Sequence, residues 1–513
     1  MVNRIYSNRI SEYAHENGGR VIILLLLFLL LLYEFLHSGY NTFAIICLSP
    51  LLIVIVYASF RWKMAAFWGL IIVNYILQMK DSYLPSGVPM SLWDEILELM
   101  IIIMTIVDAR HKPHFNRCLN LMLFGIIIWL TFGTLQLFNN TCDLGMDVAA
   151  WFTSFRIIAL QLLWILIVFS ICITSPRTLL VYLRLWAALA LFSAFWTWKQ
   201  KIIGFTPTEY AWLYYGPGQT THLLNARTLV RYFSTFSDAA NYGCNAAATS
   251  VTFFIIAITS KIKWEKIFFI FVCICVIWGM FQSGTRTAIF SLAAGFMAYV
   301  ILSKSFKIAI PFGIFFAFFM GMLVFTNIGN GNQQIRRMRS AFNKNDASAN
   351  VRDINKAAIA KYMKDAPWGI GFGYTPSNIP ANNKFNPVSN IPPDSEYVYI
   401  WVHSGIIGIT VFIISMLIMW LGACWIVMYK LQSPSLIGIG GALCCAFLAI
   451  QLSAYANQVL FQYPNGLTFF GGLAIVYILP HIEPEWIEYE QQRIAKQEAK
   501  KRLKKIKKFV TRV

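Results

Sequence analysis

The sequence predicts an all-α protein: a polytopic transmembrane helical bundle of about fourteen spans with a large, partly helical extracytoplasmic loop. Of its 513 residues, 58% are hydrophobic and 13% are charged. The mean hydropathy of +0.59 is far above that of a soluble domain. The apolar residues occur in runs of about 18 or more, and each such run is long enough to cross a bilayer as a helix.

The first apolar run, 21–36, follows three arginines and lacks the small-residue cleavage site of a signal peptide, so we expect a retained first helix. The other expected spans are 42–60, 64–79, 92–107, 118–138, 152–174, 179–197, 239–260, 265–281, 287–303, 307–326, 405–429, 436–457 and 464–480. The chain then divides into eleven spans within 1–326, which include the loop 198–238, a polar loop at 327–404, three spans within 405–480, and a tail at 481–513.

Basic residues in the short loops between spans predict the orientation. The formal net charge is +19, but its distribution over alternate short loops and the tail argues against a nucleic-acid-binding groove. The positive-inside rule places both termini in the cytoplasm and the loops 198–238, 282–286 and 327–404 on the opposite face. The basic loop residues are Arg61, Lys63, Arg110, Lys112, Arg117, Arg177, Lys261, Lys263, Lys266, Lys304, Lys307 and Lys430.

The tail from Glu485 ends in KQEAKKRLKKIKKFVTRV and is strongly basic and helix-forming. We expect it to bind anionic lipid headgroups at the cytoplasmic face. The ten cysteines lie mostly within apolar segments, and no CxxC pair or His/Cys cluster indicates a metal site or a disulfide framework. The sequence therefore predicts no metal and no cofactor.

The loop 327–404 is the longest polar interval between apolar runs. Loops of this length are usually functional or disordered, and its aromatic and helix-forming residues argue against disorder. It contains an expected amphipathic helix at 351–365, followed by the segment GIGFGY. That segment lacks the spacing and the strand–helix context of a dinucleotide site, so we expect a tight bend.

Three arginines outside the expected spans are candidates for phosphate binding. Arg286 lies in the short turn QSGTRTA, where a charge is costly unless it is paired or lines a wet cavity. Arg231 precedes a span, and Arg352 lies on the expected loop helix. Arginine is always charged, and its planar donors suit phosphate oxygens. If these arginines converge on one cavity, a pyrophosphate-bearing lipid would suit it.

Other charged residues have simpler interpretations. The arginines within 336–339 favour contact with solvent or lipid headgroups. Arg156 is expected to pair with an acid such as Asp94 or Glu98, which lie four residues apart on one helix face. Capping and pairing are therefore the expected roles of these two acids.

Two residues near the end of the polar loop are candidates for a general base. His403 has a suitable side-chain pKa for this role, although a lone histidine is often structural. Asp394 precedes an expected helix, where capping is the alternative role, and it would need desolvation to bring its pKa towards neutrality.

Four segments together resemble the bacterial O-antigen ligase and O-antigen polymerase superfamily. They read RYFSTFSDAANYG, SGTRTA, VRDINKAAIAKYMKDAPWGIGFGY and DSEYVYIWVHSGIIG, in the family's order, between about Arg231 and Gly408. Each motif alone is loose, but four in order within a basic polytopic protein are fairly specific.

The resemblance implies metal-independent, inverting glycosyl transfer on the periplasmic face of the bacterial inner membrane, from a glycan on undecaprenyl pyrophosphate to a sugar hydroxyl. In that family arginines hold the pyrophosphate, and Arg231, Arg286 and Arg352 fall in the corresponding motif positions. Arg286 is then expected to act in catalysis by offsetting charge on the leaving group. Asp394 or His403 would accept the proton of the acceptor.

Aromatic residues are the candidates for glycan binding. Tyr214 and Tyr215 lie in the loop 198–238, and Tyr397 follows the candidate base Asp394. With Tyr210 and Trp212, the first two could form a platform for sugar rings. Anchoring at the membrane interface is an equally consistent role for this platform.

One position bears on the choice between polymerase and ligase. In ligases of the family the last motif begins with His-Asn, eleven residues ahead of a glycine, whereas here Asp394 and Ser395 take that position relative to Gly405. This favours a polymerase of O-antigen or other surface-polysaccharide repeat units, with a chain-length regulator as a further partner. The alternatives are a ligase acting on lipid A–core or protein, and a transporter of lipid-linked sugars. A transporter predicts charges within several spans and paired halves, and the sequence shows few such charges and no such halves.

Overall fold

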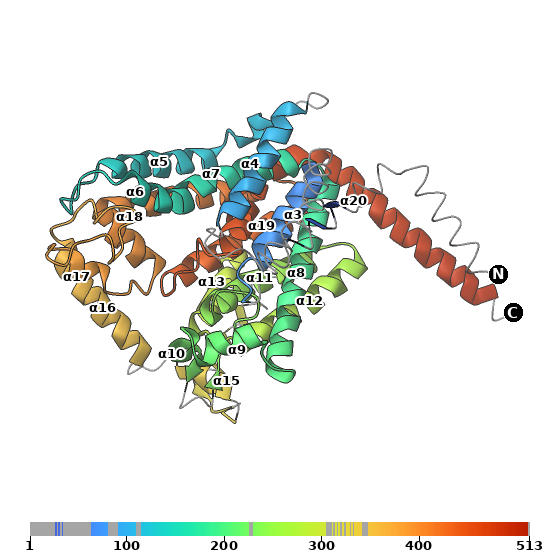
Figure 1. The fold of residues 1–513 in the computed structure, drawn as a ribbon. Coiled ribbons are helices and arrows are strands. Elements are labelled where there is room, and N and C mark those ends of the chain that lie inside the picture. The colour runs from blue at the N-terminus through green and yellow to red at the C-terminus, as the bar shows by residue number, and fades with distance from the viewer. Residues whose placement is uncertain are drawn as a thin grey trace. The chain divides into compact units, whose positions relative to one another are not determined.

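The structure is a computed structural model that describes residues 63–80, 91–108, 114–224, 229–303 and 347–510, parts of 310–340, and five residues between 26 and 33. The chain divides into two units, 1–66 and 67–513. All described residues of the first unit are helical. The second unit contains the remaining elements of the fold (Figure 1).

The main helices follow one another along the chain. They are α3 (Lys63–Ile76), α4 (Ser91–Val107), α5 (Leu121–Leu135), α6 (Val148–Phe155), α7 (Gln161–Cys172), α8 (Pro176–Ile202), α11 (Ala239–Thr259), α12 (Lys263–Gln282), α13 (Arg286–Leu302), α18 (Glu396–Trp425), α19 (Pro434–Ala454) and α20 (Gly471–Val510). Three π-helical turns extend or join them: η3 (Arg156–Leu160), η5 (Ile426–Lys430) and η6 (Gly466–Phe470).

The connections contain shorter elements. These are the 3-10 turns η1 (Phe115–Cys118) and η2 (Gln136–Phe138), and the helices α9 (Pro207–Tyr214), α10 (Gly218–His222), α15 (Gln333–Arg339), α16 (Ala347–Met363) and α17 (Asn386–Ser389). The strands β1 (Leu223–Leu224) and β2 (Leu229–Val230) pair antiparallel, with Leu223 opposite Val230. The expected loop helix at 351–365 is thus α16, which begins four residues earlier and ends two residues earlier than expected.

The all-α, polytopic helical class is confirmed, but the number of about fourteen spans is not. Among the described residues, eight helices are long and apolar enough to cross a membrane. The expected spans 21–36, 42–60 and 307–326 lie wholly or largely outside the described residues. Two more, α3 and α13, are shorter apolar helices, and α4 carries three acidic residues.

Polar side chains mark where several helices begin. Asn120 accepts two backbone N–H bonds at the start of α5, and Asp238 accepts two at the start of α11. Ser175 and Thr178 form a reciprocal capping box ahead of α8. Each cap satisfies N–H groups that have no partner inside their own helix. The cap on α11 also fixes the end of the helix against which the candidate site is built.

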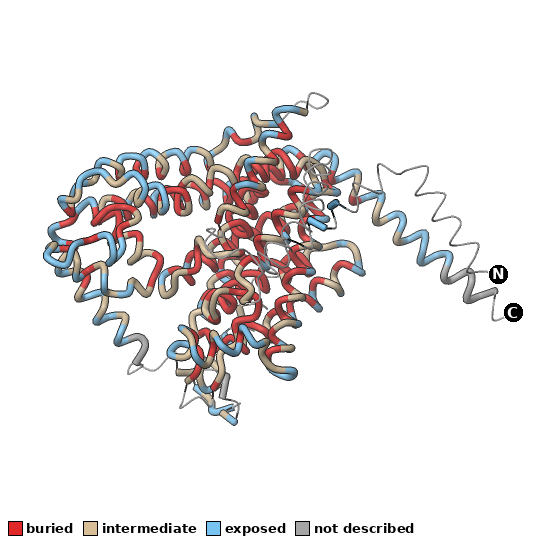
Figure 2. The backbone as a smooth tube through the Cα atoms, in the orientation of Figure 1, coloured by how far each residue is buried: buried red, intermediate tan, exposed pale blue. Residues whose placement is uncertain are grey.

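Helix α11 lies at the centre of the packing and contacts α12, α13 and α19 (Figure 1). Most residues of α11 are buried, as are most residues of α19. Figure 2 shows buried residues concentrated where these helices meet. Three consecutive alanines at 246–248 are buried in α11. Small residues allow helix backbones to approach closely inside a membrane.

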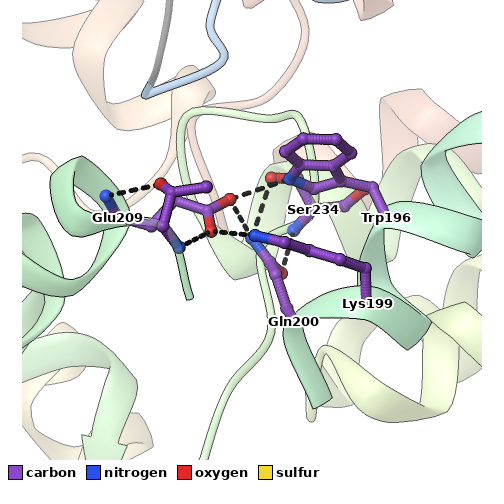
Figure 3. Close-up of polar contacts among 6 residues, drawn as sticks. Trp196, Lys199, Gln200, Glu209 and Ser234 are labelled. Atoms are coloured by element: carbon purple, nitrogen blue, oxygen red, sulfur yellow. Dashed lines mark hydrogen bonds and ion pairs between the residues drawn. The ribbon is translucent and has the colours of Figure 1, made fainter. Parts of the chain in front are cut away.

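The loop 198–238 is folded against the end of α8 by one buried carboxylate (Figure 3). Glu209 Oε1 accepts hydrogen bonds from Trp196 Nε1 (2.8 Å) and Gln200 Nε2 (2.7 Å). Its Oε2 accepts from Lys199 Nζ at 3.2 Å, which also forms an ion pair. Gln200 in turn accepts from the backbone N–H of Ser234 (3.0 Å). These contacts hold the described residues of the loop, 198–224 and 229–238, as a compact layer, and its Leu213, Leu223 and Phe233 form a small core with Ala239 of α11.

The second half of the polar loop, after α16, also has a core of its own. Buried side chains from α16, the glycine segment, α17 and the start of α18 pack together: Ile359, Met363, Ala366, Ile370, Tyr374, Ile379, Phe385, Val388 and Val402, with Cys142. Burial of this apolar surface stabilises the segment as a folded layer. The long polar interval is therefore an ordered structure over its described residues from 347 onwards, as its composition predicted.

The expected partners of Arg156 were wrong. Arg156 Nη1 lies 3.1 Å from Glu95 Oε2, and Arg156 Nη2 donates to Ser91 Oγ at 2.7 Å. Ser91 and Glu95 are four residues apart and share one face of α4. Asp94 and Glu98 share the neighbouring face, where they accept hydrogen bonds from Asn74 and Gln161 instead.

Candidate functional site

The candidate site is built around the turn at 283–287, which joins α12 to α13. Gly284 has a φ of +59°, a left-handed conformation that glycine adopts without steric cost. The Thr285 hydroxyl donates to the Ala239 carbonyl at the start of α11 (2.7 Å). The turn is thereby held against the capped end of α11. It carries Arg286 and is contacted directly by Arg231 and Arg337, and by Arg352 through Asn457.

Arg231 binds the turn directly. Its Nε donates to the Ser283 carbonyl and its Nη2 to the Thr285 hydroxyl, both at 3.2 Å. Its Nη1 donates to the Thr221 carbonyl of α10 at 3.1 Å. Arg231 therefore joins the described part of the loop 198–238 to the turn, and three of its five N–H groups are directed at the protein itself.

The three arginines that the sequence singled out share one electrostatic environment. Burial lowers the pKa of the Arg231 guanidinium, and the charges of Arg286 and Arg352 act in the same direction. The carboxylate of Asp238 opposes them. The positive charges of Arg286 and Arg352 therefore act on the Arg231 guanidinium, and an anion placed among these arginines would offset their repulsion.

A fourth arginine, Arg337, reaches the same turn from α15. Its Nε donates to the Gly284 carbonyl at 2.6 Å. Arg336 and Arg339, its neighbours on α15, contact Asn330 instead. The interpretation of this basic cluster as solvent or headgroup contacts therefore missed Arg337, because the spacing of the arginines does not show which one faces the turn.

Arg286 and Arg352 complete the arginine set. Arg286 is the first residue of α13, and its Nη1 donates to Ser340 Oγ just after α15 (3.4 Å). Arg352, on α16, donates through Nη2 to Asn457 Oδ1 at 3.4 Å. Asn457 Nδ2 donates in turn to Thr287 Oγ1 at 2.8 Å. The structure thus links Arg352 to the residue directly after Arg286.

A cavity of about 450 Å³ adjoins this network on the side of α16 and α18. Asp394 lines it, and Asp394 Oδ2 accepts a hydrogen bond from Asn355 Nδ2 at 3.0 Å. Arg352 lies one helical turn before Asn355 on the same face of α16. The other lining residues include Asp353, Lys356, Ser395, Tyr397, Trp401 and Tyr455. The structure therefore brings a carboxylate and an arginine to one concave surface.

The segment 454–460, which begins at the last residue of α19, fixes the position of Asp394. The backbone N–H of Glu396 donates to the Asn457 carbonyl (3.3 Å), and Glu396 Oε2 accepts from the Leu460 N–H (3.0 Å). The same segment contacts the arginine of α16. It therefore couples the arginines around the turn to the carboxylate in the cavity.

Asn457 belongs to the candidate site, but the sequence pattern did not single it out. The expected span 436–457 placed it inside a membrane helix, but α19 ends at Ala454. The polar and turn-forming residues after that point, Asn457, Gln458 and the Pro464–Gly466 triplet, are the signal for an earlier helix end.

His403 lies outside the set of residues that line the cavity. Its Nδ1 is 2.9 Å from the Gly371 carbonyl, and the backbone N–H of Gly371 donates to the His403 carbonyl (3.1 Å). Gly369, Gly371 and Gly373 all have positive φ, so the expected tight bend is confirmed. In this structure His403 holds that bend against α18.

The candidate glycan-binding tyrosines lie in two places. Tyr397 lines the cavity beside Asp394. Tyr214 stacks on Tyr210 with ring centroids 4.4 Å apart, and Tyr215 is 82% exposed. Tyr214 and Tyr215 are not among the residues that line the cavity. Trp212 packs instead on His222 and Phe233.

His222 has a structural role at the start of α11. Its Nε2 accepts from the Ala239 N–H at 2.9 Å, and its Nδ1 lies 2.7 Å from the Thr221 hydroxyl. Burial lowers the pKa of His222 to about 3, and the charges of Arg231 and Lys80 add to the effect. The ring is neutral at physiological pH and serves as a second cap on α11.

The fold is that of a polytopic helical membrane protein, and the candidate site places several arginines near a cavity that Asp394 lines. Residues 271–413 match the family model described as O-antigen ligase. This match confirms the resemblance to the O-antigen ligase and polymerase superfamily, and it indicates a membrane enzyme of the glycosyltransferase type. The matched residues contain Arg286, Arg337, Arg352 and Asp394, whereas Arg231 and Asn457 lie outside them. No curated protein matches the chain.

Among the described residues, no group of three or more His, Cys, Asp or Glu side chains is arranged to hold a metal ion. The charged groups that the described site offers to a substrate are guanidinium, ammonium and carboxylate.

Proposed function

We propose that this protein is a polymerase of O-antigen or a related surface polysaccharide in the bacterial inner membrane. It joins oligosaccharide repeat units carried on undecaprenyl pyrophosphate, on the periplasmic face, by metal-independent inverting glycosyl transfer. One observation carries the proposal: arginines from three separate segments converge on the 283–287 turn beside a cavity that holds Asp394.

The arginines are proposed to bind the pyrophosphate of the donor. Guanidinium groups present paired donors that match phosphate oxygens, and their charge offsets the negative charge that develops as the pyrophosphate leaves. Loss of one such preorganised contact typically costs about 10²–10³ in rate. Arg231 and Arg337 also donate to backbone carbonyls of the turn, so they both shape the site and charge it.

Asp394 is proposed as the general base. In the transfer step the acceptor hydroxyl attacks the anomeric carbon of the donor sugar from the face opposite the pyrophosphate. A glycosidic C–O bond forms while the bond from the anomeric carbon to the phosphate oxygen breaks. The electron pair of the broken bond leaves with the polyprenyl pyrophosphate, and the hydroxyl proton passes to the Asp394 carboxylate. The anomeric configuration is inverted in this single displacement.

The cavity favours Asp394 over His403 in this role. Asp394 lines the cavity, and one of its oxygens is engaged by Asn355. A candidate base must come within hydrogen-bond reach of the hydroxyl that it deprotonates, whereas His403 is buried and bound to the glycine bend. Tyr397 is the first candidate for stacking on a sugar ring, with Tyr214 and Tyr215 as an outer platform for a longer glycan.

The second candidate function is a ligase that transfers finished glycan from the carrier lipid to lipid A–core or protein. The description of the matching family model favours it. The Asp394–Ser395 pair, where ligases of the family carry His-Asn, favours the polymerase. Both candidates use the same arginines and the same leaving group, and they differ in the acceptor.

The test compares surface glycan on gels from a deletion strain complemented with wild type, Arg286→Ala or Arg336→Ala. Arg336 contacts Asn330 rather than the turn, so its variant is the matched control for loss of one positive charge. A polymerase predicts core bearing a single repeat unit, with the long ladder absent in the deletion and in Arg286→Ala. A ligase predicts bare core and long polymer retained on the carrier lipid. A normal ladder in the deletion strain rejects both functions for that polymer.

A further inference from the structure

A second, smaller cavity lies between α18 and α19 and has a different character from the first. It has a volume of about 130 Å³. Most of its lining is apolar: Ile413, Met416, Leu417 and Trp420 from α18, and Phe447, Leu448 and Leu452 from α19. The remaining two lining residues are Tyr397 and Gln451. We call this cavity the α18–α19 groove.

The groove adjoins the Asp394 cavity through one residue. Tyr397 lines both cavities. Its hydroxyl donates to Gln451 Oε1 at 2.8 Å and lies 3.3 Å from the Gln451 carbonyl. A polar pair therefore marks the junction, with the charged cavity on one side and an apolar slot on the other.

The groove is bordered by exposed apolar side chains on two helices of membrane-spanning length. Both α18 and α19 meet the length and composition of membrane spans. Leu417 and Leu452 are each 46% exposed, and Ile413 is 42% exposed. Deeper in, Trp420 Nε1 donates to the Cys444 carbonyl at 3.0 Å and ties the two helices together. A chain lying in the groove can thus leave it sideways into the bilayer.

The polar end of the groove carries an unused donor. Gln451 is 7% exposed, and within the described part of the chain its Nε2 is buried without a hydrogen-bond acceptor. A buried donor without a partner costs free energy, and it is an apt contact for an acceptor atom of a bound molecule. Such an atom at the junction implies an amphiphile, with a polar group beside Gln451 and hydrocarbon beyond it.

We propose that the α18–α19 groove binds the first part of the polyprenyl chain of a lipid-linked substrate whose pyrophosphate and sugar occupy the Asp394 cavity. This inference rests on the proposed function and adds a binding site for the lipid. An apolar cavity of about 150 Å³ holds a molecule of the size of benzene. The groove therefore accommodates about one five-carbon isoprene unit by the same measure, and the rest of the chain extends into the membrane.

The groove is a single slot, and this favours a lipid with one hydrocarbon chain over a phospholipid with two. A polyprenyl phosphate has one chain attached to its phosphate, whereas a phospholipid has two chains on a glycerol. The groove offers room for one chain beside one buried donor. Phospholipid capture is therefore the competing outcome in the test.

The first test is independent of catalysis. A benzophenone amino acid replaces Leu417 in the full-length protein, in membranes that contain polyprenyl pyrophosphate and phospholipid, and cross-linked lipid is identified by mass spectrometry after illumination. Ile414 is the matched control, since it is 46% exposed on the same helix but does not line the groove. We expect polyprenyl adducts enriched at least several-fold at position 417 over position 414. Phospholipid adducts alone, or equal polyprenyl yields at both positions, overturn the proposal.

The second test separates the groove from the reaction. Leu452→Trp fills the groove, and Ile414→Trp adds the same bulk outside it. We expect Leu452→Trp to raise KM for the long-chain lipid-linked substrate about tenfold, while the rate with a short-chain, water-soluble analogue stays at the wild-type level. Equal KM values in the two variants overturn the groove assignment. If wild type turns over neither substrate, the proposed function itself fails, and the cross-linking result still decides the lipid site.

Discussion

The Asn355 side chain donates to Asp394 Oδ2 at 3.0 Å, across the cavity wall between α16 and α18. The same face of α16 presents Arg352 one turn earlier. One short amphipathic helix therefore sets the positions of the proposed base and of one proposed pyrophosphate ligand. Because Asn355 engages one carboxylate oxygen, the other can face the acceptor hydroxyl.

This relationship predicts that Asp394→Asn lowers the transfer rate by about 10²–10⁴, the usual contribution of a general base. The amide keeps the shape and can still accept from Asn355, so the fold should persist. The measurement is kcat for glycan extension with purified protein in proteoliposomes.

His403→Gln provides the comparison for that prediction. The amide nitrogen of glutamine can donate to the Gly371 carbonyl, and we expect a loss of less than tenfold in kcat together with lower thermal stability. If His403→Gln instead abolishes turnover while Asp394→Asn is nearly active, the assignment of the base is reversed.

Arg337 gives the second prediction, because its Nε donates to the Gly284 carbonyl in the turn that bears Arg286. Arg337→Ala removes both a positive charge and a brace of the turn. We expect it to lower kcat/KM about 10²-fold, in line with loss of a preorganised electrostatic contact. Arg337→Lys should restore part of the activity, since the charge returns without the planar donors.

Arg336→Ala is the matched control for Arg337, one residue away on the same short helix. It removes an equal charge that contacts Asn330. Activity should stay within about twofold of wild type, because an exposed charge outside the site contributes little. Equal losses in the two variants would point to the net charge of α15 rather than to the contact with the turn.

Most membrane helices could be located from the sequence. A long apolar run that crosses a bilayer must pair its backbone N–H and C=O groups internally, and a helix does so. The span expected at 239–260 is α11 at Ala239–Thr259, and the span expected at 265–281 is α12 at Lys263–Gln282. Helix ends were harder to place. The helix α18 begins nine residues before the span expected at 405–429, because Ser395 caps it and Glu396 binds the distant segment 454–460.

The sequence predicted the types of residue in the candidate site, but it identified only some of the individual residues. Arg286 stood out because a charge between apolar spans is costly, and Arg352 because an arginine on the expected loop helix offers planar donors that suit phosphate oxygens. Arg337 and Asn457 did not, since their roles depend on contacts with residues 53 and 170 positions away, Gly284 and Thr287. The partner of Arg156 was misplaced for a related reason. A helix-face argument identifies which acids lie together but not which face turns towards the arginine.

Gly405 supports the third prediction. Its φ of +69° interrupts α18, and an added Cβ would lie 2.0 Å from the Pro367 carbonyl oxygen. Gly405→Ala should therefore separate the glycine bend from α18. The backbone conformation alone costs ~1–3 kcal/mol for a residue other than glycine, and the clash adds to it.

The measurement for Gly405→Ala is thermal unfolding of the purified protein in detergent, where we expect a lower Tm. Gly69→Ala in α3 is the control, because apart from its own helix backbone no atom of the described residues lies within 4 Å of its added Cβ. Alanine in a helix is favoured over glycine by ~0.5–1 kcal/mol, so this variant should melt at or above the wild-type temperature. A Gly405→Ala protein that melts with wild type would show that the bend tolerates displacement.

His222 gives a prediction about pH. In the unfolded chain its pKa has the ordinary value of 6.5, whereas burial lowers it to about 3 in the folded protein. Between these values the unfolded chain binds a proton that the folded protein does not, so the stability contributed by neutral His222 is lost as the pH falls below 6.5. His222→Gln keeps an oxygen that can accept from the Ala239 N–H but cannot titrate. We therefore expect Tm to fall less between pH 7 and pH 4 in His222→Gln than in wild type, and parallel losses in the two proteins would place the acid sensitivity elsewhere.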